Sequence, residues 1–323
     1  MPVSMGTGPL DLPSGPLTKG LKAVFKNAYD TAWDASILSR IATHILSSQD
    51  SEDYPWMGAT PKLREFNGPR ELANLANFNY NIKNKKWENT IGIPREDIED
   101  DKYGIIKLRV QQLAQEAARY PEELAITAIQ TALGAPTAAA SIGYDGQGFF
   151  DTDHPATSNI GGAVQSNLVT VEMTYANFWA AVYKMMIFKD DVGRVLNMVP
   201  DTLLVEPYLL DRALDFAHSA QNVDSATANV SSKMNQIKSL NIKVECSPFL
   251  GSNTSAAASN WVLMCTKGVV KPLIFQDRVP VQFGSLEKES DAGFMTGQYV
   301  YGTYSRWNIG WGPWFTCVGS TGT

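Results

Sequence analysis

One long amphipathic segment, residues 98–133, limits the folds that are open to this chain. Apolar residues recur through it at helical spacing, and carboxylates crowd its start, where they favour the positive end of a helix dipole. Pro121 is expected to kink or restart the helix. At a rise of 1.5 Å per residue the segment spans about 50 Å, which exceeds the core of an ordinary small domain. We therefore expect this helix to lie along an extended body.

The residues before this helix are charged and short of apolar side chains. Ten Lys or Arg and eight Asp or Glu lie between residues 62 and 109. Within this region residues 78–82 and 89–93 alternate apolar and polar side chains, as half-buried strands do. A two-stranded ribbon of this composition cannot form a core of its own, so it must lie on something else.

The N-terminal residues 1–20 predict an extended arm. Four prolines and four glycines in this stretch preclude a regular element. Ordering such a segment costs conformational entropy, so we expect contacts with a neighbouring subunit to hold it. Residues 18–47 then have apolar side chains at helical spacing and predict a helix.

The rest of the chain mixes helices and strands. A helix is expected near residues 174–189, and a strand followed by a helix over 202–218. Residues 242–244 and 261–265 predict strands of a sheet. Residues 270–318 contain only strand and turn patterns. This order indicates an α/β part spliced between strands.

Composition excludes several classes of protein. Apolar residues make up 44 % of the chain and charged residues 19 %, which excludes global disorder. The net charge of −6 lacks the basic balance of a protein that grips nucleic acid. No apolar run reaches the length of a membrane span. Cys246, Cys265 and Cys317 are odd in number and widely spaced, so reduced thiols are expected rather than disulfides or a zinc site.

One short motif could carry chemistry. Asp151, Asp153 and His154 place three potential metal ligands in four residues, and a hydrolase could use them. The only other histidines, His44 and His218, are far away in sequence. The favoured interpretation is a turn in which these side chains bond backbone amides. We therefore expect no catalytic, cofactor-binding or metal-binding residues.

Two further clusters have a structural and a functional interpretation. A basic group could touch phosphate, but nearby glutamates make a solvated, ion-paired ribbon the favoured interpretation. Three C-terminal tryptophans could stack on a ring-shaped ligand, but they more often anchor a last strand in the core or in a subunit contact. The first group is Lys83, Lys85 and Lys86; the second is Trp307, Trp311 and Trp314.

Several strings of residues resemble a known family. They run from TIGIPREDIEDD, which starts at Thr90, through YDGQGFFDTDHP, which starts at Tyr144, to KPLIFQ at Lys271, YGTYSR at Tyr301 and GWGPW at Gly310. Together they resemble the Mu-like major head subunit, the gpT family of tailed-bacteriophage capsid proteins. The similarity covers the chain from about residue 54 to 315.

The resemblance implies the HK97-like capsid fold, an α+β fold with an N-terminal arm, an E-loop hairpin and a long spine helix. The spine helix belongs to a peripheral domain, and an axial domain is inserted into that domain. The implied boundaries are 1–53 for the N-terminal arm and helix, 54–97 for the E-loop, 98–194 with 263–323 for the peripheral domain with its spine helix at 98–133, and 195–262 for the axial domain.

The resemblance also implies a function: a major capsid protein that assembles into an icosahedral head around double-stranded DNA. It implies no enzyme activity, no cofactor and no membrane. Its implied partners are other copies in hexamers and pentamers, a separate scaffolding protein, a portal and decoration proteins. The implied location is the virion, after assembly in the bacterial host cytoplasm. Two alternatives stay open: an encapsulin-type nanocompartment shell, and a metal-dependent hydrolase that uses Asp151, Asp153 and His154.

Overall fold

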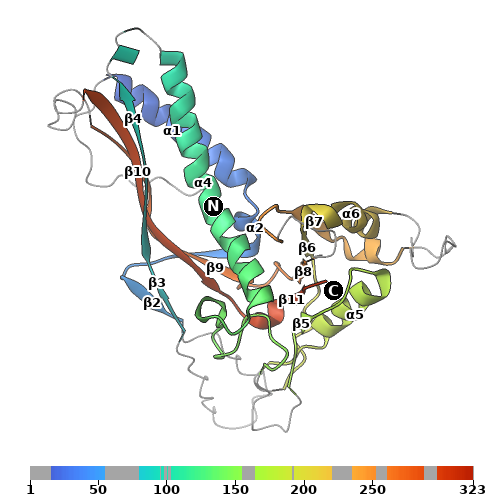
Figure 1. Ribbon diagram of the computed structural model, residues 1–323. Coiled ribbons are helices and arrows are strands. Elements are labelled where there is room, and N and C mark those ends of the chain that lie inside the picture. Colours follow the sequence, from blue (N-terminus) through green and yellow to red (C-terminus); the bar gives the residue numbers. More distant parts are fainter. Residues whose placement is uncertain are drawn as a thin grey trace, which may run out of the picture.

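The described chain contains two larger sheets, which one long helix joins, and a small two-stranded sheet (Figure 1). In the first body, α1 and α4 lie along a long, narrow sheet. In the second, α5 and α6 flank a smaller sheet, which also contains the last strand, β11. This computed structural model describes residues 16–54, 80–94, 96–97, 100, 103–154, 164–190, 193–219, 235–251, 260–286 and 297–322.

The first sheet has the strand order β1-β9-β10-β4. β9 (Leu273–Leu286) and β10 (Gln298–Trp311) form a long antiparallel pair, β4 (Lys85–Pro94) pairs antiparallel with β10, and β1 (Ala42–Leu46) pairs parallel with β9. Side chains alternate along β10 between buried and half-buried, as in a sheet with one covered face.

Helices α4 (Tyr103–Gly134) and α1 (Pro16–Ala35) pack against each other and against this sheet. Aromatic rings fill the interface. Phe25 of α1 stacks on Phe283 at 4.9 Å between ring centroids, and Trp33 lies 5.2 Å from Phe275. At the end of α1, a carboxylate oxygen of Glu122 in α4 accepts hydrogen bonds from the Ser36 hydroxyl and the Ile37 amide. These contacts hold the two helices together.

The second sheet has the order β5-β11-β8-β6-β7. Three of its strands are buried along their whole length, as expected of a sheet covered on both faces. Its strands are β5 (Leu168–Val169), β6 (Thr202–Val205), β7 (Lys243–Cys246), β8 (Trp261–Met264) and β11 (Cys317–Ser320), and its helices are α5 (Tyr175–Met186) and α6 (Leu210–His218).

Short elements complete the described chain. They are α2 (Leu38–Ile41), β2 (Ser51–Asp53), which pairs with β3 (Asn81–Lys83), and the 3-10 turns η2 (Ala139–Ser141), η3 (Pro207–Leu209), η4 (Ile237–Leu240) and η5 (Trp314–Thr316). No helix in the described ranges is long and apolar enough to cross a membrane.

Two helix predictions need correction. The helix expected over 18–47 ends at Ala35, and residues 42–46 form strand β1, because pairing with β9 outweighs their local helical spacing. The long helix is described from Tyr103 to Gly134, with no acidic residue in its first turn. Pro121 does not restart it, since α4 runs through this position as one helix.

The ribbon expected over 54–97 is only partly described, and residues 55–79 lie outside the described residues. The described part belongs to this chain's own sheets. The Gln276 side-chain amide donates to the Ile82 carbonyl at 3.0 Å, and the Tyr80 hydroxyl accepts from the Trp311 amide at 2.7 Å. In residues 80–94 the ribbon therefore lies on strands β9 and β10 of its own chain.

The expected domain boundaries do not coincide with the sheets. Strand β11 and strand β5 fall in the expected peripheral domain, yet both are hydrogen-bonded into the sheet that holds β6 and β7 of the expected axial domain. Residues 1–15 of the arm and residues 220–234 lie outside the described residues.

Candidate functional site

The DTDH motif forms a turn on the surface of the second body. The Asp151 carboxylate accepts hydrogen bonds from the backbone amides of Thr152 at 2.6 Å and Asp153 at 3.2 Å, which is an Asx-turn. Asp153 itself is exposed. Asp151 therefore has the expected capping role.

His154 has a different environment from the one expected of it. Its side chain is fully buried and bonds two side chains rather than backbone amides. Nδ1 lies 2.7 Å from the Asp145 carboxylate, and Nε2 lies 3.0 Å from the Asn167 side-chain oxygen. The ring also stacks on Trp314, with centroids 4.2 Å apart and planes at 7°.

The Asn167 side-chain amide is held with its oxygen toward this histidine. Its nitrogen donates to the carbonyls of Phe149 and Trp314, so its oxygen is left to face His154 as an acceptor. Both ring nitrogens of His154 therefore face acceptor oxygens, one on the buried Asp145 carboxylate and one on Asn167. Neither ring nitrogen is available to a metal or a substrate.

The partners of His154 were not identified from the sequence. Asp145 lies nine positions before the histidine, Asn167 follows thirteen positions after it, and Trp314 is close to the C-terminus. Only the fold brings them together. Across the described ranges there is no group of three or more His, Cys, Asp or Glu that could hold a metal ion.

The C-terminal tryptophans have structural positions. Trp307, Trp311 and Trp314 are each less than 6 % exposed, and the Trp311 ring stacks on Phe149 at 4.4 Å. The Trp311 indole N–H donates to the Ala140 carbonyl at 2.9 Å. These rings join the end of β10 to the loop after α4.

A buried carboxyl group lies at the end of β6. Glu206 is 1 % exposed, and its Oε1 has no hydrogen-bond partner among the described residues. Burial raises the pKa of this carboxyl, and a hydrogen bond from the Asn260 backbone amide opposes the shift. Gly251 lies directly against it with φ at +114°, and any side chain there would collide with the carboxyl.

Large apolar side chains are exposed together at the end of α5. Tyr183, Ile187, Val164 and Val195, here called the α5 patch, are each more than half exposed. Backbone pairing between Lys189 and Val195, and hydrogen bonds between Gln165 and Lys189, bring these chain segments together. Exposed apolar side chains gathered in one region are typical of surfaces that contact other macromolecules.

The sequence of this chain is similar to those of known proteins. A family model described as "Mu-like prophage major head subunit gpT" matches residues 15–172, 168–250 and 243–323, which together span nearly the whole chain. Two curated proteins are similar over shorter stretches. The Mu-like prophage FluMu major head subunit of Haemophilus influenzae is 38 % identical over 146 residues, and the major capsid protein of Escherichia phage Mu is 37 % identical over 124 residues.

These two stretches cover 44 % and 38 % of this chain, and 46 % and 39 % of the relatives, so the similarity spans less than half of each relative. A solved structure gives wider coverage. A chain in the procapsid of bacteriophage JBD30 superposes with a TM-score of 0.55 and 26 % identity, over 96 % of this chain and 76 % of that chain.

Proposed function

Because this chain belongs to the Mu-like prophage major head subunit gpT family and has the HK97-like capsid fold, we propose that it is the major capsid protein of a tailed bacteriophage. In this role many copies close into an icosahedral head around packaged double-stranded DNA. The observation that carries the proposal is the family match from residue 15 to residue 323, which includes both sheets and the helix that joins them.

The structure supports a shell subunit in mechanical terms. Helix α4 has 32 residues and contacts both sheets, so it can act as a stiff spine between two bodies. The α5 patch and the exposed Ile105 and Leu108 at the start of α4 lie on different bodies. Apolar surfaces at separate places on one subunit allow heterologous contacts, and such contacts close into rings.

The partners follow from this role. The subunit would bind its own copies in hexamers and pentamers, with a separate scaffolding protein, a portal and decoration proteins as further partners. The net charge of −6 suits a wall along which DNA slides without sequence-specific binding. Assembly would take place in the bacterial host cytoplasm, and the mature subunit would reside in the virion.

We further propose that the chain is not an enzyme. The hydrolase alternative required Asp151, Asp153 and His154 to converge on a metal or a substrate. His154 instead has both ring nitrogens in hydrogen bonds to Asp145 and Asn167, and Asp151 caps the turn. The DTDH motif therefore has a sufficient structural explanation.

Electron microscopy of the expressed chain, with and without the scaffolding protein of the same phage, tests the main proposal. We expect closed shells of uniform size, and nuclease-resistant double-stranded DNA inside heads from infected cells. Shells that hold a protein cargo and no DNA would favour the nanocompartment. A purified chain that carries stoichiometric metal, hydrolyses a substrate and never assembles would favour the hydrolase.

A further inference from the structure

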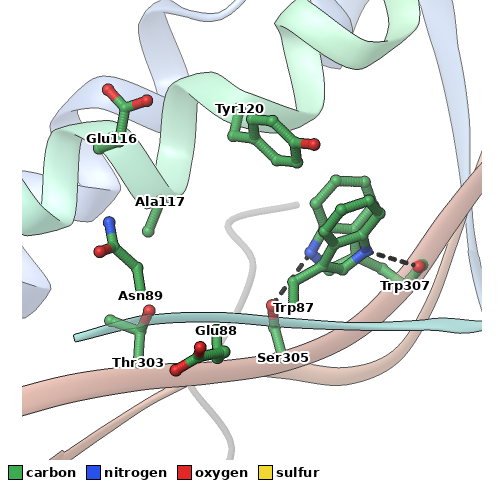
Figure 2. A pocket seen from close by; sticks show the side chains of 9 residues that line it. All are labelled: Trp87, Glu88, Asn89, Glu116, Ala117, Tyr120, Thr303, Ser305 and Trp307. Carbon is green, nitrogen blue, oxygen red and sulfur yellow. Dashed lines mark hydrogen bonds between the residues drawn. The ribbon is translucent and has the colours of Figure 1, made fainter.

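A hollow of about 260 Å³ lies between α4 and the strand pair β4–β10 (Figure 2). The rings of Trp87, Trp307 and Tyr120 form one end of it, and Asn89 points from β4 toward the helix. Pockets that hold drug-sized ligands have volumes of about 300–1,000 Å³, so this hollow has room for one long side chain. β4 is the outer strand of its sheet, where another chain can approach.

The aromatic rings of the hollow are held in place by the protein itself. Trp87 and Trp307 stack at 4.9 Å between ring centroids, and Tyr120 meets Trp87 edge-on at 5.1 Å. The Trp87 indole N–H donates to the Trp307 carbonyl at 3.0 Å, and the Trp307 indole N–H donates to the Ser305 hydroxyl at 3.1 Å. Because both indole N–H groups are engaged, the hollow offers ring surface rather than ring donors.

The polar side chains of the hollow can accept hydrogen bonds. Those of Asn89 and Thr303 make no hydrogen bond to any residue that the structure describes. The Ser305 hydroxyl oxygen accepts the Trp307 indole N–H and keeps a second lone pair. Each of the three can therefore present an acceptor oxygen to an occupant.

The hollow also carries negative charge. Glu88 and Glu116 are among the residues that line it, whereas no described lysine or arginine is. The Glu88 carboxylate accepts a hydrogen bond from Thr90, and the exposed Glu116 carboxylate has no hydrogen bond or ion pair within the described ranges. Lys85 and Lys86 precede Trp87 on β4, but neither forms an ion pair with these carboxylates. The complementary occupant is a cation.

An arginine side chain matches the rings, the acceptors and the charge together. Its guanidinium group has five N–H donors and no acceptor, stacks on aromatic faces and pairs with carboxylates. Arginine is also enriched where protein chains meet. We propose that the hollow binds the guanidinium group of an arginine from a second copy of this chain. The inference rests on the proposed function, in which the subunit binds its own copies.

The described arginines of the same chain do not fill the hollow. None of them lines it, and Arg119 of α4 lies over the Phe249 ring at 5.2 Å instead. Arg109 and Arg278 have no hydrogen bond or ion pair within the described ranges. Their guanidinium groups are therefore available to the hollow of a second copy.

Saturation-transfer NMR of the free subunit with N-acetyl-arginine amide as the probe tests the site. The native subunit should bind this probe at least tenfold more tightly than N-acetyl-citrulline amide, a neutral analogue of similar shape, because only the cation gains from the rings and the carboxylate. Glu116→Gln should weaken probe binding about threefold, and Ala117→Phe should abolish it by filling the hollow. Glu123→Gln, on α4 but outside the hollow, is the matched control and should bind like the native subunit.

Closed shells distinguish an arginine of a second copy from a free small cation. A neighbouring arginine already fills the hollow in native shells, so they should bind the probe at least tenfold more weakly per subunit than free subunits do. Equal binding by shells and free subunits would overturn the assignment to a second copy.

Equal binding of the arginine and citrulline amides by the free subunit would overturn the cation site itself. Glu116 is exposed, so Glu116→Gln decides this point even where Ala117→Phe fails to fold. Native shells would still support the proposed function in each of these cases, so the two failures are distinguishable.

Discussion

At the scale of single residues, the second body depends on buried polar groups whose partners come from distant parts of the sequence. His154 is fully buried between Asp145, Asn167 and Trp314, and therefore ties the turn after Phe150 to the C-terminal segment. Glu206 is buried with only part of its carboxyl satisfied among the described residues. His154 stabilises the fold through its hydrogen bonds, whereas Glu206 makes the free energy of unfolding depend on pH.

Asp145→Asn should strongly destabilise the folded subunit. The change removes a carboxylate oxygen that lies 2.7 Å from Nδ1 of the buried His154 ring, and loss of one partner of a buried hydrogen bond typically costs about 1–3 kcal/mol. Chemical denaturation at neutral pH measures the loss. Asp153→Ala is the matched control, since Asp153 is exposed in the same turn and should change the free energy of unfolding by less than about 0.5 kcal/mol. Equal effects of the two changes would contradict this account of His154.

Glu206→Gln should flatten the dependence of stability on pH. Burial raises the pKa of Glu206 above its ordinary value of 4.5, so the folded state keeps a proton that the unfolded state releases. The stabilisation from this proton is complete below pH 4.5 and is lost as pH rises through the folded-state pKa. Glutamine stays neutral throughout and removes this loss. Denaturation curves measured across this range check the prediction, with the exposed Glu172→Gln as a control that should follow the native chain.

At the scale of elements, α4 joins the two bodies by very close packing. A Cβ on Gly319 of β11 would lie 2.5 Å from Leu133 of α4 and 2.7 Å from Phe150, so the strand approaches the helix as only glycine allows. On the opposite side of this sheet, Phe178 of α5 lies 6.3 Å from Trp261 of β8. The second sheet therefore packs between the C-terminal end of α4 on one face and α5 on the other.

Gly319→Ala should loosen this junction. An added methyl group must displace Leu133 or Phe150, and overpacking of a core typically costs about 1–3 kcal/mol. Gly284→Ala is a matched control in strand β9, because nothing lies within 4 Å of a Cβ built there. Thermal unfolding should show a lower midpoint for Gly319→Ala alone. A lower midpoint for both variants would indicate a general strand effect rather than loss of this contact.

The elements also show what the sequence could predict. Strands β6 and β8 and helix α5 were expected where they occur, because apolar runs and helical spacing are local signals. Strand β1 was missed, since its pairing with β9 joins residues far apart in the chain. For the same reason the turn at Asp151 was predictable from its own residues, whereas the Asp145, Asn167 and Trp314 contacts of His154 were not.

At the scale of the whole molecule, the subunit combines a well-packed interior with exposed apolar surface on both bodies. Core residues from α1, α4 and both sheets form one continuous cluster, so the two bodies should unfold together. The residues of the α5 patch lie outside that cluster. Tyr183 stacks on Trp179 at 5.4 Å between ring centroids, but more than half of each patch side chain stays exposed, as expected of a surface that contacts other subunits.

Replacing Tyr183 and Ile187 of the α5 patch with serine should therefore impair assembly and leave folding intact. Both side chains are exposed in the isolated subunit, at 59 % and 65 %, so their loss removes little buried area within the chain. If assembly buries them, each is worth about 1.5–3 kcal/mol, and about 1.4 kcal/mol changes an association constant tenfold. Shell yield by sedimentation should fall at least tenfold, with an unchanged unfolding transition of the free subunit.

Val269→Ser, at an exposed site with 97 % of its surface free, is the matched control and should assemble normally. Normal shells from the Tyr183 and Ile187 double variant would show that this patch lies outside the subunit contacts, while shells formed by the native chain would still support the proposed function.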